Sequence, residues 1–218
     1  MKVVILNSGM GTRMGVFTKE HPKCMTEISE KETILSAQLK NIVNSGIKDV
    51  VITTGFFNDV LIEYCNSLQL PLNIEYVYNP IFDKTNYIYS IYCAYQILHD
   101  TDIILMHGDM VFESDVFEKI VHSNESCMTV SSTVELPKKD FKAVLKNDKI
   151  MAIGIDFFEN AVSAQPLYKL FKKDWNVWLD QICKYCQDGK DKCYAENAFN
   201  DISSNICLRA LEDRKSVV

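Results

Sequence analysis

Short apolar runs alternate with helix-like segments through the first 110 residues of the chain. The runs are rich in β-branched side chains and end at turn residues, which is typical of buried strands; we expect them at 2–6, 49–54, 73–78 and 102–106. The segments between them carry apolar residues at close to helical spacing and predict helices at 33–44, 60–68 and 87–98. This order predicts parallel strands with right-handed crossovers and helices on both faces of the sheet.

The pattern after residue 110 is less regular. Residues 127–134 predict a strand, and 141–145 is expected to pair with 149–155 across a turn at Asn147-Asp148. Residues 165–185 look helical from their start, and 194–213 predict one or two further helices. The sequence shows no internal repeat or linker, so we expect one domain over residues 1–218.

Composition narrows the classes of function. Of the 218 residues, 47% are hydrophobic and 24% are charged, which is ordinary for a globular protein. The formal net charge of −6 argues against a duplex nucleic-acid binder, which usually has a basic surplus. No run reaches the roughly 18 apolar residues that span a bilayer, and the apolar run at the N-terminus is too short for a signal peptide. We therefore expect a cytoplasmic protein with no nucleic-acid or membrane partner.

The chain has 8 cysteines, including the C-x-x-C pair Cys183 and Cys186, followed by Cys193. A zinc or redox site would need further partners at ligand spacing, and no second C-x-x-C follows the pair. The favoured interpretation is that the cysteines stay reduced and act as small apolar residues.

The loop after the first strand carries the strongest chemical signal. In a parallel sheet ligands bind beyond the carboxyl ends of the strands, where this loop and residues 107–110 both lie. Gly9 and Gly11 allow a tight turn whose N–H groups can face an anion. Arg13 and Lys23, the latter stiffened by Pro22, can balance the charge of a triphosphate and of its transition state. The spacing lacks the third glycine of a dinucleotide fingerprint and is not a Walker P-loop.

These positions resemble the signature of the sugar-phosphate and phosphocholine nucleotidyltransferase family, which has a GT-A-like fold. The pattern L-x-x-G-x-G-T-R-x-x-x-x-T-x-x-x-P-K is matched at Leu6, Gly9, Gly11, Thr12, Arg13, Thr18, Pro22 and Lys23. The chain departs from the family at Asn7-Ser8, where two alanines are more usual, beside the base and ribose. The resemblance implies an α/β fold: a three-layer Rossmann-like domain with a mainly parallel mixed sheet, in which 1–110 binds the nucleotide and 111–218 the acceptor.

The resemblance also assigns roles to individual residues. Arg13 and Lys23 are the expected catalytic residues, and Asp109, at the end of the fourth strand, is the expected ligand of Mg²⁺. The nucleotide is expected to contact Leu6, Asn7, Ser8, Gly9, Gly11, Thr12, Thr85, Asn86, Ser90 and Gly108. The segment from Asn79 to Ser90 is similar to that of small CTP-dependent cytidylyltransferases acting on phosphocholine or phosphoglutamine, although Thr85 and Asn86 could equally be helix caps.

The acceptor side is less well defined. Lys142, on an expected strand, is a candidate for binding the acceptor phosphate and could equally be a solvated lysine. Family members also carry a second metal-binding aspartate in a strand-end motif near the C-terminus; Asp201 and Glu196 are the candidates, unless the motif is reshaped or the chain shortened. An aromatic cage for a quaternary ammonium could form from Trp175, Trp178, Tyr185 and Tyr194, although aromatics at helical spacing are more often core.

Together these features predict a Mg²⁺-dependent cytidylyltransferase. It would transfer CMP from CTP to phosphocholine, an aminoalkylphosphonate or a phosphorylated amino acid, releasing pyrophosphate, for decoration of surface polysaccharide or lipid. A sugar-1-phosphate uridylyl- or thymidylyltransferase is the alternative within the class, and a nucleotide-binding module without catalysis is the alternative outside it. The missing third glycine argues against an NAD(P)-dependent enzyme. The chain could act as a homodimer.

Overall fold

The computed structural model describes residues 1–9, 11 and 21–213. A nine-stranded sheet runs through both halves of the chain in the order β5-β4-β1-β6-β10-β7-β11-β9-β8. Its strands are β1 (Lys2–Leu6), β4 (Asp49–Thr54), β5 (Asn73–Tyr78), β6 (Ile103–His107), β7 (Cys127–Ser131), β8 (Lys142–Lys146), β9 (Lys149–Gly154), β10 (Ala161–Leu170) and β11 (Arg209–Glu212). A separate small hairpin joins β2 (Glu27–Ser29) to β3 (Glu32–Thr33).

The sheet is mixed, and its parallel part belongs mainly to the N-terminal half. Strands β5, β4, β1 and β6 form parallel pairs, whereas β10 is antiparallel to both β6 and β7. Since β11 is parallel to β7, the strands β1, β6, β7 and β11 all run in the same direction. Their carboxyl ends therefore meet at one edge of the sheet.

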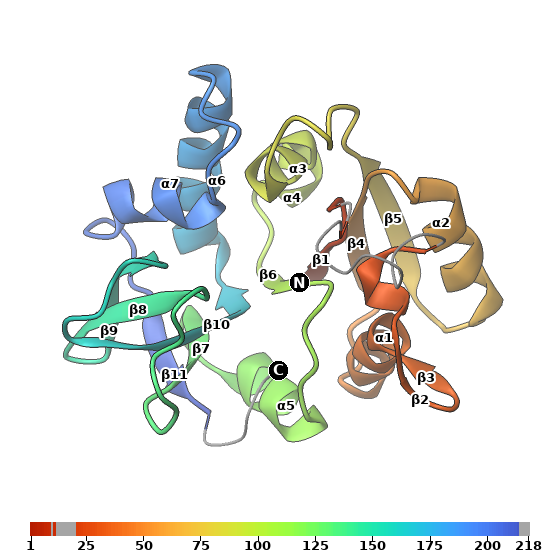
Figure 1. Ribbon diagram of the computed structural model, residues 1–218, viewed down its shortest axis with the longest axis horizontal. Helices are drawn as coiled ribbons and strands as arrows, with labels where there is room; N and C mark the ends of the chain where they lie inside the picture. Colours follow the sequence, from red (N-terminus) through yellow and green to blue (C-terminus); the bar gives the residue numbers. More distant parts are fainter. Residues whose placement is uncertain (10, 12–20, 214–218) are drawn as a thin grey trace.

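Helices cover both faces of this sheet (Figure 1). They are α1 (Ile34–Asn44), α2 (Asn58–Ser67), α3 (Tyr87–Cys93), α4 (Tyr95–Leu98), α5 (Ser114–His122), α6 (Lys172–Gln187) and α7 (Ala195–Ile202), with the 3-10 helix η2 at Lys23–Met25. One apolar cluster joins α3, α4, α6 and α7 to the sheet, and a second joins α1, α2 and α5 to its other face. The domain thus has the expected three layers.

Alternation along the strands produces these two clusters. In β1, Val4 and Leu6 belong to the first cluster and Val3 and Ile5 to the second. Successive strand residues point to opposite faces, so a fully apolar run is needed where helices cover both sides. This is why the β1 sequence reads as continuous apolar residues.

The N-terminal elements confirm the predictions made from the sequence. The strands at 49–54 and 73–78 have the expected bounds, and the helix expected at 33–44 begins at Ile34, with Thr33 as its N-cap. The helix expected at 87–98 is divided at Ala94 into α3 and α4. The predicted hairpin of β8 and β9 also forms, and both turn residues, Asn147 and Asp148, have positive φ angles.

The prediction of a helix beginning at residue 165 is wrong. Residues Ala161–Leu170 form the long strand β10, and α6 begins only at Lys172. Proline is also common in the first turn of a helix, so Pro166 does not by itself distinguish a helix start from a strand. In the structure Pro166 lies where the register with β7 shifts between Ala164 and Tyr168, a bulge that tolerates a residue without an N–H donor.

The region 194–213 was predicted to hold one or two further helices, and it holds one, α7, followed by a strand. Residues Arg209–Glu212 form β11, which pairs with β7. Four residues are too few for a periodic signal, and the strand is specified by its neighbour rather than by its own pattern.

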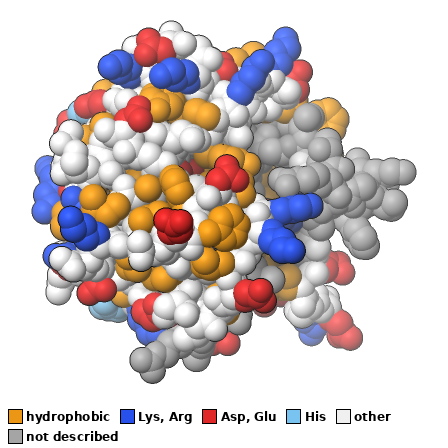
Figure 2. All heavy atoms as spheres, turned by 60° about the vertical axis from the view of Figure 1, so that its left-hand side comes forward, with side chains coloured by type: hydrophobic (Ala, Val, Ile, Leu, Met, Phe, Trp, Pro, Cys, Tyr) orange, Lys and Arg blue, Asp and Glu red, His pale blue; other side chains and the backbone are white. Residues whose placement is uncertain are grey.

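The sequence predicted no membrane-spanning segment and cysteines that stay reduced. No helix in the described part of the chain is long and apolar enough to cross a membrane. All eight cysteines are free, and Cys24, Cys65 and Cys127 are buried. On the face shown in Figure 2, apolar side chains gather in the middle with acidic side chains between them, and Lys and Arg lie around this area, some beside it and some at the margin.

Candidate active site

A cavity of about 920 Å³ opens where residues following the aligned strand ends come together. Both halves of the chain line it. The N-terminal half contributes Leu6, Asn7, Ser8, Gly9, Gly11, Pro22, Lys23, Phe82, Thr85, Asn86, Tyr87, His107, Asp109 and Met110. The C-terminal half contributes Val134, Glu135, Pro137, Lys139, Asp140, Phe141, Ile155, Ser163, Ala164, Gln165, Pro166 and Tyr194. The cavity is large enough for a drug-sized ligand.

Lys23 and Asp109 meet on the wall of this cavity, although 86 positions separate them in the sequence. The Lys23 Nζ lies 2.6 Å from Asp109 Oδ2, and both side chains are about two-fifths exposed. A pair so open to water contributes little to stability, roughly 0–1 kcal/mol. The contact can therefore be exchanged for a ligand at small cost.

The environment of Asp109 favours its ionised form. Burial opposes ionisation, but the hydrogen bond and charge of Lys23, with a smaller effect of His107, hold the pKa of the carboxyl below its usual value. Burial also lowers the pKa of His107 below its ordinary value, so this imidazole is neutral near pH 7. Asp109 is thus a carboxylate, with oxygen donors for a hard cation.

A chain of hydroxyl and amide groups holds the start of the loop that follows β1. Ser8 Oγ shares a hydrogen bond of 2.6 Å with Ser90 Oγ, and both residues are buried. Asn79 donates to Ser90 Oγ and to Thr85 Oγ1, and it accepts a hydrogen bond from the backbone of Ile81. The segment 79–90 is therefore fixed to the loop at Ser8.

Two glycines permit close backbone approach beside this loop. A Cβ at Gly55 would lie 2.3 Å from the carbonyl oxygen of Ser8, and one at Gly108 would lie 1.7 Å from the Asn7 side chain. At Gly55 a side chain would displace the loop backbone, whereas at Gly108 it would displace the Asn7 side chain. The Asn7 side chain, which replaces the alanine usual in the family, thus occupies space left by Gly108.

Most of the described residues expected to contact nucleotide do line the cavity. They are Leu6, Asn7, Ser8, Gly9, Gly11, Thr85 and Asn86. Ser90 and Gly108 lie behind the lining, where the first braces Ser8 and the second accommodates Asn7. Asn86 also caps α3, since its side chain accepts from the N–H of Tyr87. Thr12, Arg13 and Thr18 lie outside the described residues.

Lys142 does not line the cavity. Its side chain is buried, and the ammonium donates to the carbonyl oxygens of Pro137 at 2.6 Å and Asp140 at 3.0 Å. It also lies over the Phe158 ring, 4.4 Å from the centroid. Lys142 therefore organises the loop 137–140, whereas the exposed Lys139 of that loop lines the cavity.

The two candidates for the second acid occupy other positions. Asp201 accepts a hydrogen bond from Tyr185 at 2.6 Å and does not line the cavity. Glu196 is buried behind the cavity wall, where it accepts hydrogen bonds from Tyr87 and Tyr168. Asp213 directly follows β11, at the same sheet edge as Asp109, and is buried with its N–H donated to Val130. Its position after a strand matches the motif expected near the C-terminus, but, like Asp201, it does not line the cavity.

Glu196 connects several elements around the cavity. It belongs to α7, and its tyrosine partners belong to α3 and β10. Burial and the negative charge of Glu196 raise the pKa of Tyr87 and of Tyr168 well above the ordinary value, so both hydroxyls remain donors. The ring of Tyr87 packs edge-on against His107, with 4.8 Å between centroids.

The aromatic residues of α6 are mainly core, the interpretation that their helical spacing favoured over a cage. Trp175 and Trp178 are fully buried in the core, where their indole N–H groups donate to backbone carbonyls. Of the residues considered for a cage only Tyr194 lines the cavity, and its ring lies 5.0 Å from Phe141 and 5.9 Å from Tyr87. Neither partner was identified from the sequence, because they come from elements distant along the chain.

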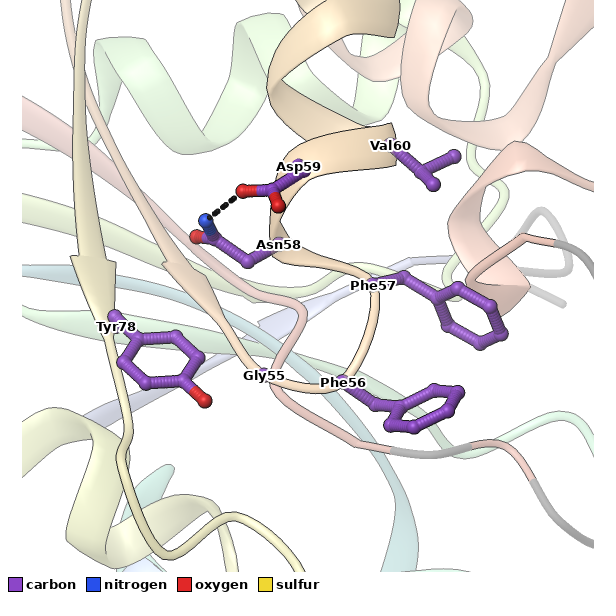
Figure 3. A pocket seen from close by; sticks show the side chains of 7 residues that line it. All are labelled: Gly55, Phe56, Phe57, Asn58, Asp59, Val60 and Tyr78. Atoms are coloured by element: carbon purple, nitrogen blue, oxygen red, sulfur yellow. Dashed lines mark hydrogen bonds between the residues drawn. The ribbon is translucent and has the colours of Figure 1, made fainter.

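A smaller hollow of about 350 Å³ lies at the ends of β4 and β5, lined by Gly55 to Val60 and Tyr78. Figure 3 shows Phe56 beside Phe57, with Tyr78 on the other side of Gly55 and Asn58 hydrogen bonded to Asp59. Neither Lys23 nor Asp109 lines this hollow, so the large cavity is the candidate active site.

Three relatives of the chain are named as cytidylyltransferases or as the synthase of a CMP conjugate. The chain is 25% identical to the CTP:phosphoglutamine cytidylyltransferase of Campylobacter jejuni, over 98% of this chain and 89% of that protein. It is 30% identical to the CMP-5'-(3-aminopropyl)phosphonate synthase of Streptomyces rubellomurinus, over 61% of this chain and 21% of that protein. It is 28% identical to the choline-phosphate cytidylyltransferase of Streptococcus pneumoniae, over 48% of this chain and 43% of that protein.

Solved structures confirm the fold. The CTP:phosphocholine cytidylyltransferase from Streptococcus pneumoniae superposes with a TM-score of 0.76 at 18% identity, covering 99% of this chain and 91% of that one. The inositol-1-phosphate CTP transferase from T. maritima gives a TM-score of 0.76 at 17% identity, covering 97% and 84%. The sequence model of the MobA-like NTP transferase domain matches residues 3–180. The chain is therefore a nucleotidyltransferase that belongs to the family of MobA-like NTP transferase domains.

Proposed function

We propose that this protein is a cytidylyltransferase that moves CMP from CTP to a small phosphorylated acceptor. An acceptor phosphate or phosphonate oxygen attacks the α-phosphorus, a new P–O bond forms, and the bond to the bridging oxygen breaks to release pyrophosphate. Positioning and charge balance can carry such a transfer without a covalent enzyme intermediate. The proposed biological role is decoration of surface polysaccharide or lipid.

The observation that carries this proposal is the meeting of Lys23 and Asp109 on the cavity wall. A cation and a carboxylate from two strand-end loops, 2.6 Å apart and partly exposed, can separate to receive a triphosphate and its counter-ion. Lys23 then stabilises negative charge on the phosphate oxygens, and Asp109 is released for a cation. Arg13, on the same loop, is proposed as the second phosphate-binding cation.

The donor atoms of the site suit Mg²⁺. Within residues 1–9, 11 and 21–213 no group of three or more His, Cys, Asp or Glu side chains is arranged to hold a metal. Mg²⁺ is usually bound by one or two carboxylates together with substrate phosphates, which matches Asp109 with Asp213 as the proposed second acid. When bound, the ion would neutralise charge on the phosphates; these carboxylates would hold and orient it.

The choice of CTP rests on the segment 79–90 and on the relatives. Thr85 and Asn86 line the cavity, with Thr85 held by Asn79, so hydroxyl and amide groups are available near the nucleotide loop. The relatives named above include enzymes that act with CTP or make CMP conjugates. UTP and dTTP with a sugar 1-phosphate are the competing substrates.

The acceptor is proposed to bind against the C-terminal wall. Phe141 and Tyr194 present aromatic surface on this wall, and the ring of Tyr87 lies 5.9 Å from that of Tyr194 across from the N-terminal half. Glu135 and Asp140 add negative charge, and aromatic rings with negative charge suit an ammonium group. Lys139, rather than Lys142, is the described lysine on this wall that can meet the acceptor phosphate. Phosphocholine, aminoalkylphosphonates and phosphorylated amino acids combine both charges.

The test is pyrophosphate release with each of the four common NTPs and Mg²⁺, against a panel of small phosphorylated acceptors. We expect release with CTP and an amine-bearing acceptor. Pyrophosphate release only with UTP or dTTP and a sugar 1-phosphate would contradict the proposal and indicate a sugar-1-phosphate nucleotidyltransferase instead. Triphosphate binding without turnover under every acceptor would contradict the proposed reaction.

A further inference from the structure

Gln38 is a buried amide that the proposed chemistry leaves without a role. It lies in α1, is 2% exposed, and neighbours Leu39 of the apolar cluster along the helix. Its Oε1 is buried without a hydrogen-bond partner among the described residues, so all its hydrogen bonds are made by the NH₂ group. Burying an amide is unfavourable unless it is hydrogen bonded, so its partners indicate its purpose.

Those partners are two carbonyl groups that bracket Asp109. The Gln38 Nε2 donates to the carbonyl oxygen of His107 at 3.1 Å and to that of Met110 at 2.8 Å. Both acceptors are carbonyl oxygens, so the amide must present its NH₂ group, and the orientation is unambiguous. One side chain thus ties together both ends of the turn that carries Asp109.

The turn is otherwise weakly held. The backbone N–H of Met110 reaches the carbonyl oxygen of His107 only at 3.4 Å, a long hydrogen bond. Gly108, which precedes Asp109, donates to Leu6 at 3.0 Å, and this bond fixes only the first part of the turn. The bond from Gln38 to Met110 is the shortest of these contacts, so Gln38 sets where the turn ends.

The same helix also anchors the segment of Lys23. The N–H of Ile34, the first residue of α1, donates to the carbonyl oxygen of Thr26 at 3.1 Å, directly after η2. Helix α1 therefore contacts the lysine segment at its N-terminus and the aspartate turn one turn later through Gln38. The spacing of Lys23 and Asp109 follows from a single rigid element.

We propose that Gln38 is a positioning residue that holds the His107–Met110 turn so that Asp109 presents its carboxylate to the metal-bound nucleotide. This inference rests on the proposed function for the role of Asp109. Supporting hydrogen bonds around metal-binding groups commonly change metal affinity by about 10–100-fold when they are removed.

The test compares Gln38→Met, which keeps the length and removes both donors, with Leu39→Met as the matched control. Leu39 is equally buried on α1, and its replacement conserves volume. Gln38→Asn, which keeps the NH₂ group on a shorter side chain, provides partial rescue. Thermal unfolding of each variant checks that it is folded.

Two readouts are needed. Hydrogen exchange of residues 107–110 in the protein without metal or nucleotide should become about tenfold faster in Gln38→Met. Mn²⁺ binding, followed by electron paramagnetic resonance with the non-reacting analogue α,β-methylene-CTP, should weaken about tenfold or more. Leu39→Met should change neither, and Gln38→Asn should lie between Gln38→Met and wild type.

Unchanged exchange of the turn in Gln38→Met would overturn the inference, and so would a loosened turn that binds Mn²⁺ as wild type does. A wild-type protein that binds no Mn²⁺ with analogues of any of the four nucleotides would instead contradict the proposed function. The exchange measurement would still show whether Gln38 holds the turn.

Discussion

The two halves of the cavity are built in different ways. The N-terminal wall consists of loops that follow consecutive parallel strands, so residues near one another in the fold recur at regular intervals in the sequence. The C-terminal wall is assembled from β10, which pairs antiparallel with β7 and β8, from the loop before β8 and from Tyr194 before α7. The first wall can be recognised by motif, whereas the second depends on tertiary packing.

If the N-terminal wall carries the chemistry, Asp109→Asn should have the largest effect. The amide keeps the shape of the side chain and removes the charge that suits Mg²⁺. We expect kcat/KM for CTP to fall by about 10³-fold, since metal stabilisation contributes several kcal/mol. Pyrophosphate release over a Mg²⁺ titration measures this. Wild-type turnover with an unchanged Mg²⁺ requirement would place the metal elsewhere.

Lys23→Ala should have the next largest effect. It removes a charge from the phosphate side and no core volume, so kcat/KM should fall by about 10²-fold while the fold persists. Lys40→Ala is the control, because Lys40 is also an exposed lysine in an ion pair, with Glu32 at 2.7 Å, and does not line the cavity. Equal activity of the two variants would remove Lys23 from the proposed machinery.

Tyr168→Phe tests the packing that supports the C-terminal wall. It removes a hydrogen bond to the buried carboxylate of Glu196 without touching the cavity lining, and should lower the free energy of unfolding by about 2 kcal/mol. Denaturant unfolding measures this, and kcat should change little. A large loss of kcat with no loss of stability would contradict a purely supporting role.

The same tyrosine gives a pH dependence of stability. Its pKa in the folded protein is raised well above the ordinary value of 10.0, so as pH rises past 10 the unfolded chain loses the proton first. The contribution of the protonated Tyr168 to the free energy of unfolding is complete below pH 10. Above pH 10 it is lost by about 1.4 kcal/mol per pH unit. Tyr168→Phe should therefore flatten the decline above pH 10; an identical slope in both proteins would refute this linkage.

Tyr194→Leu should have the smallest effect and should separate the two walls. Loss of the ring should raise the KM of an amine-bearing acceptor about fivefold, equivalent to about 1 kcal/mol, and leave the KM of CTP unchanged. Steady-state kinetics with each substrate varied in turn measure both constants. A rise in the KM of CTP alone would move Tyr194 to the nucleotide side.

What the sequence could predict follows this division. The strands β1, β4 and β5 were predictable, because apolar runs ending at turn residues are local signals. Lys23 and Asp109 were each named from the sequence as site residues, but the contact between them was not predicted. The strand β10 was not predictable from its own sequence, because its extended conformation depends on pairing with β6 and β7. Asp213 was missed for the same reason, since β11 is recognisable only beside β7.

Supporting residues were also beyond reach of the sequence alone. Gln38 is one polar residue in an amphipathic helix. Lys142 was predicted either to bind the acceptor or to be solvated, and its carbonyl partners show instead that it is buried. Such roles depend on which backbone carbonyls lie within about 3 Å, and this is a property of the folded chain.

The insertion of β10 between β6 and β7 also bears on how the chain can be synthesised. The strands β1, β4, β5 and β6 are complete once residue 107 has left the ribosome, but β10, which covers the free side of β6, follows more than fifty residues later. During that interval the nascent domain displays an unpaired apolar strand edge, the kind of surface that promotes association between chains. Fragments that stop before residue 161 should therefore aggregate. The N-terminal wall can be recognised from its motif, but it cannot fold stably until β10 and the C-terminal wall have formed.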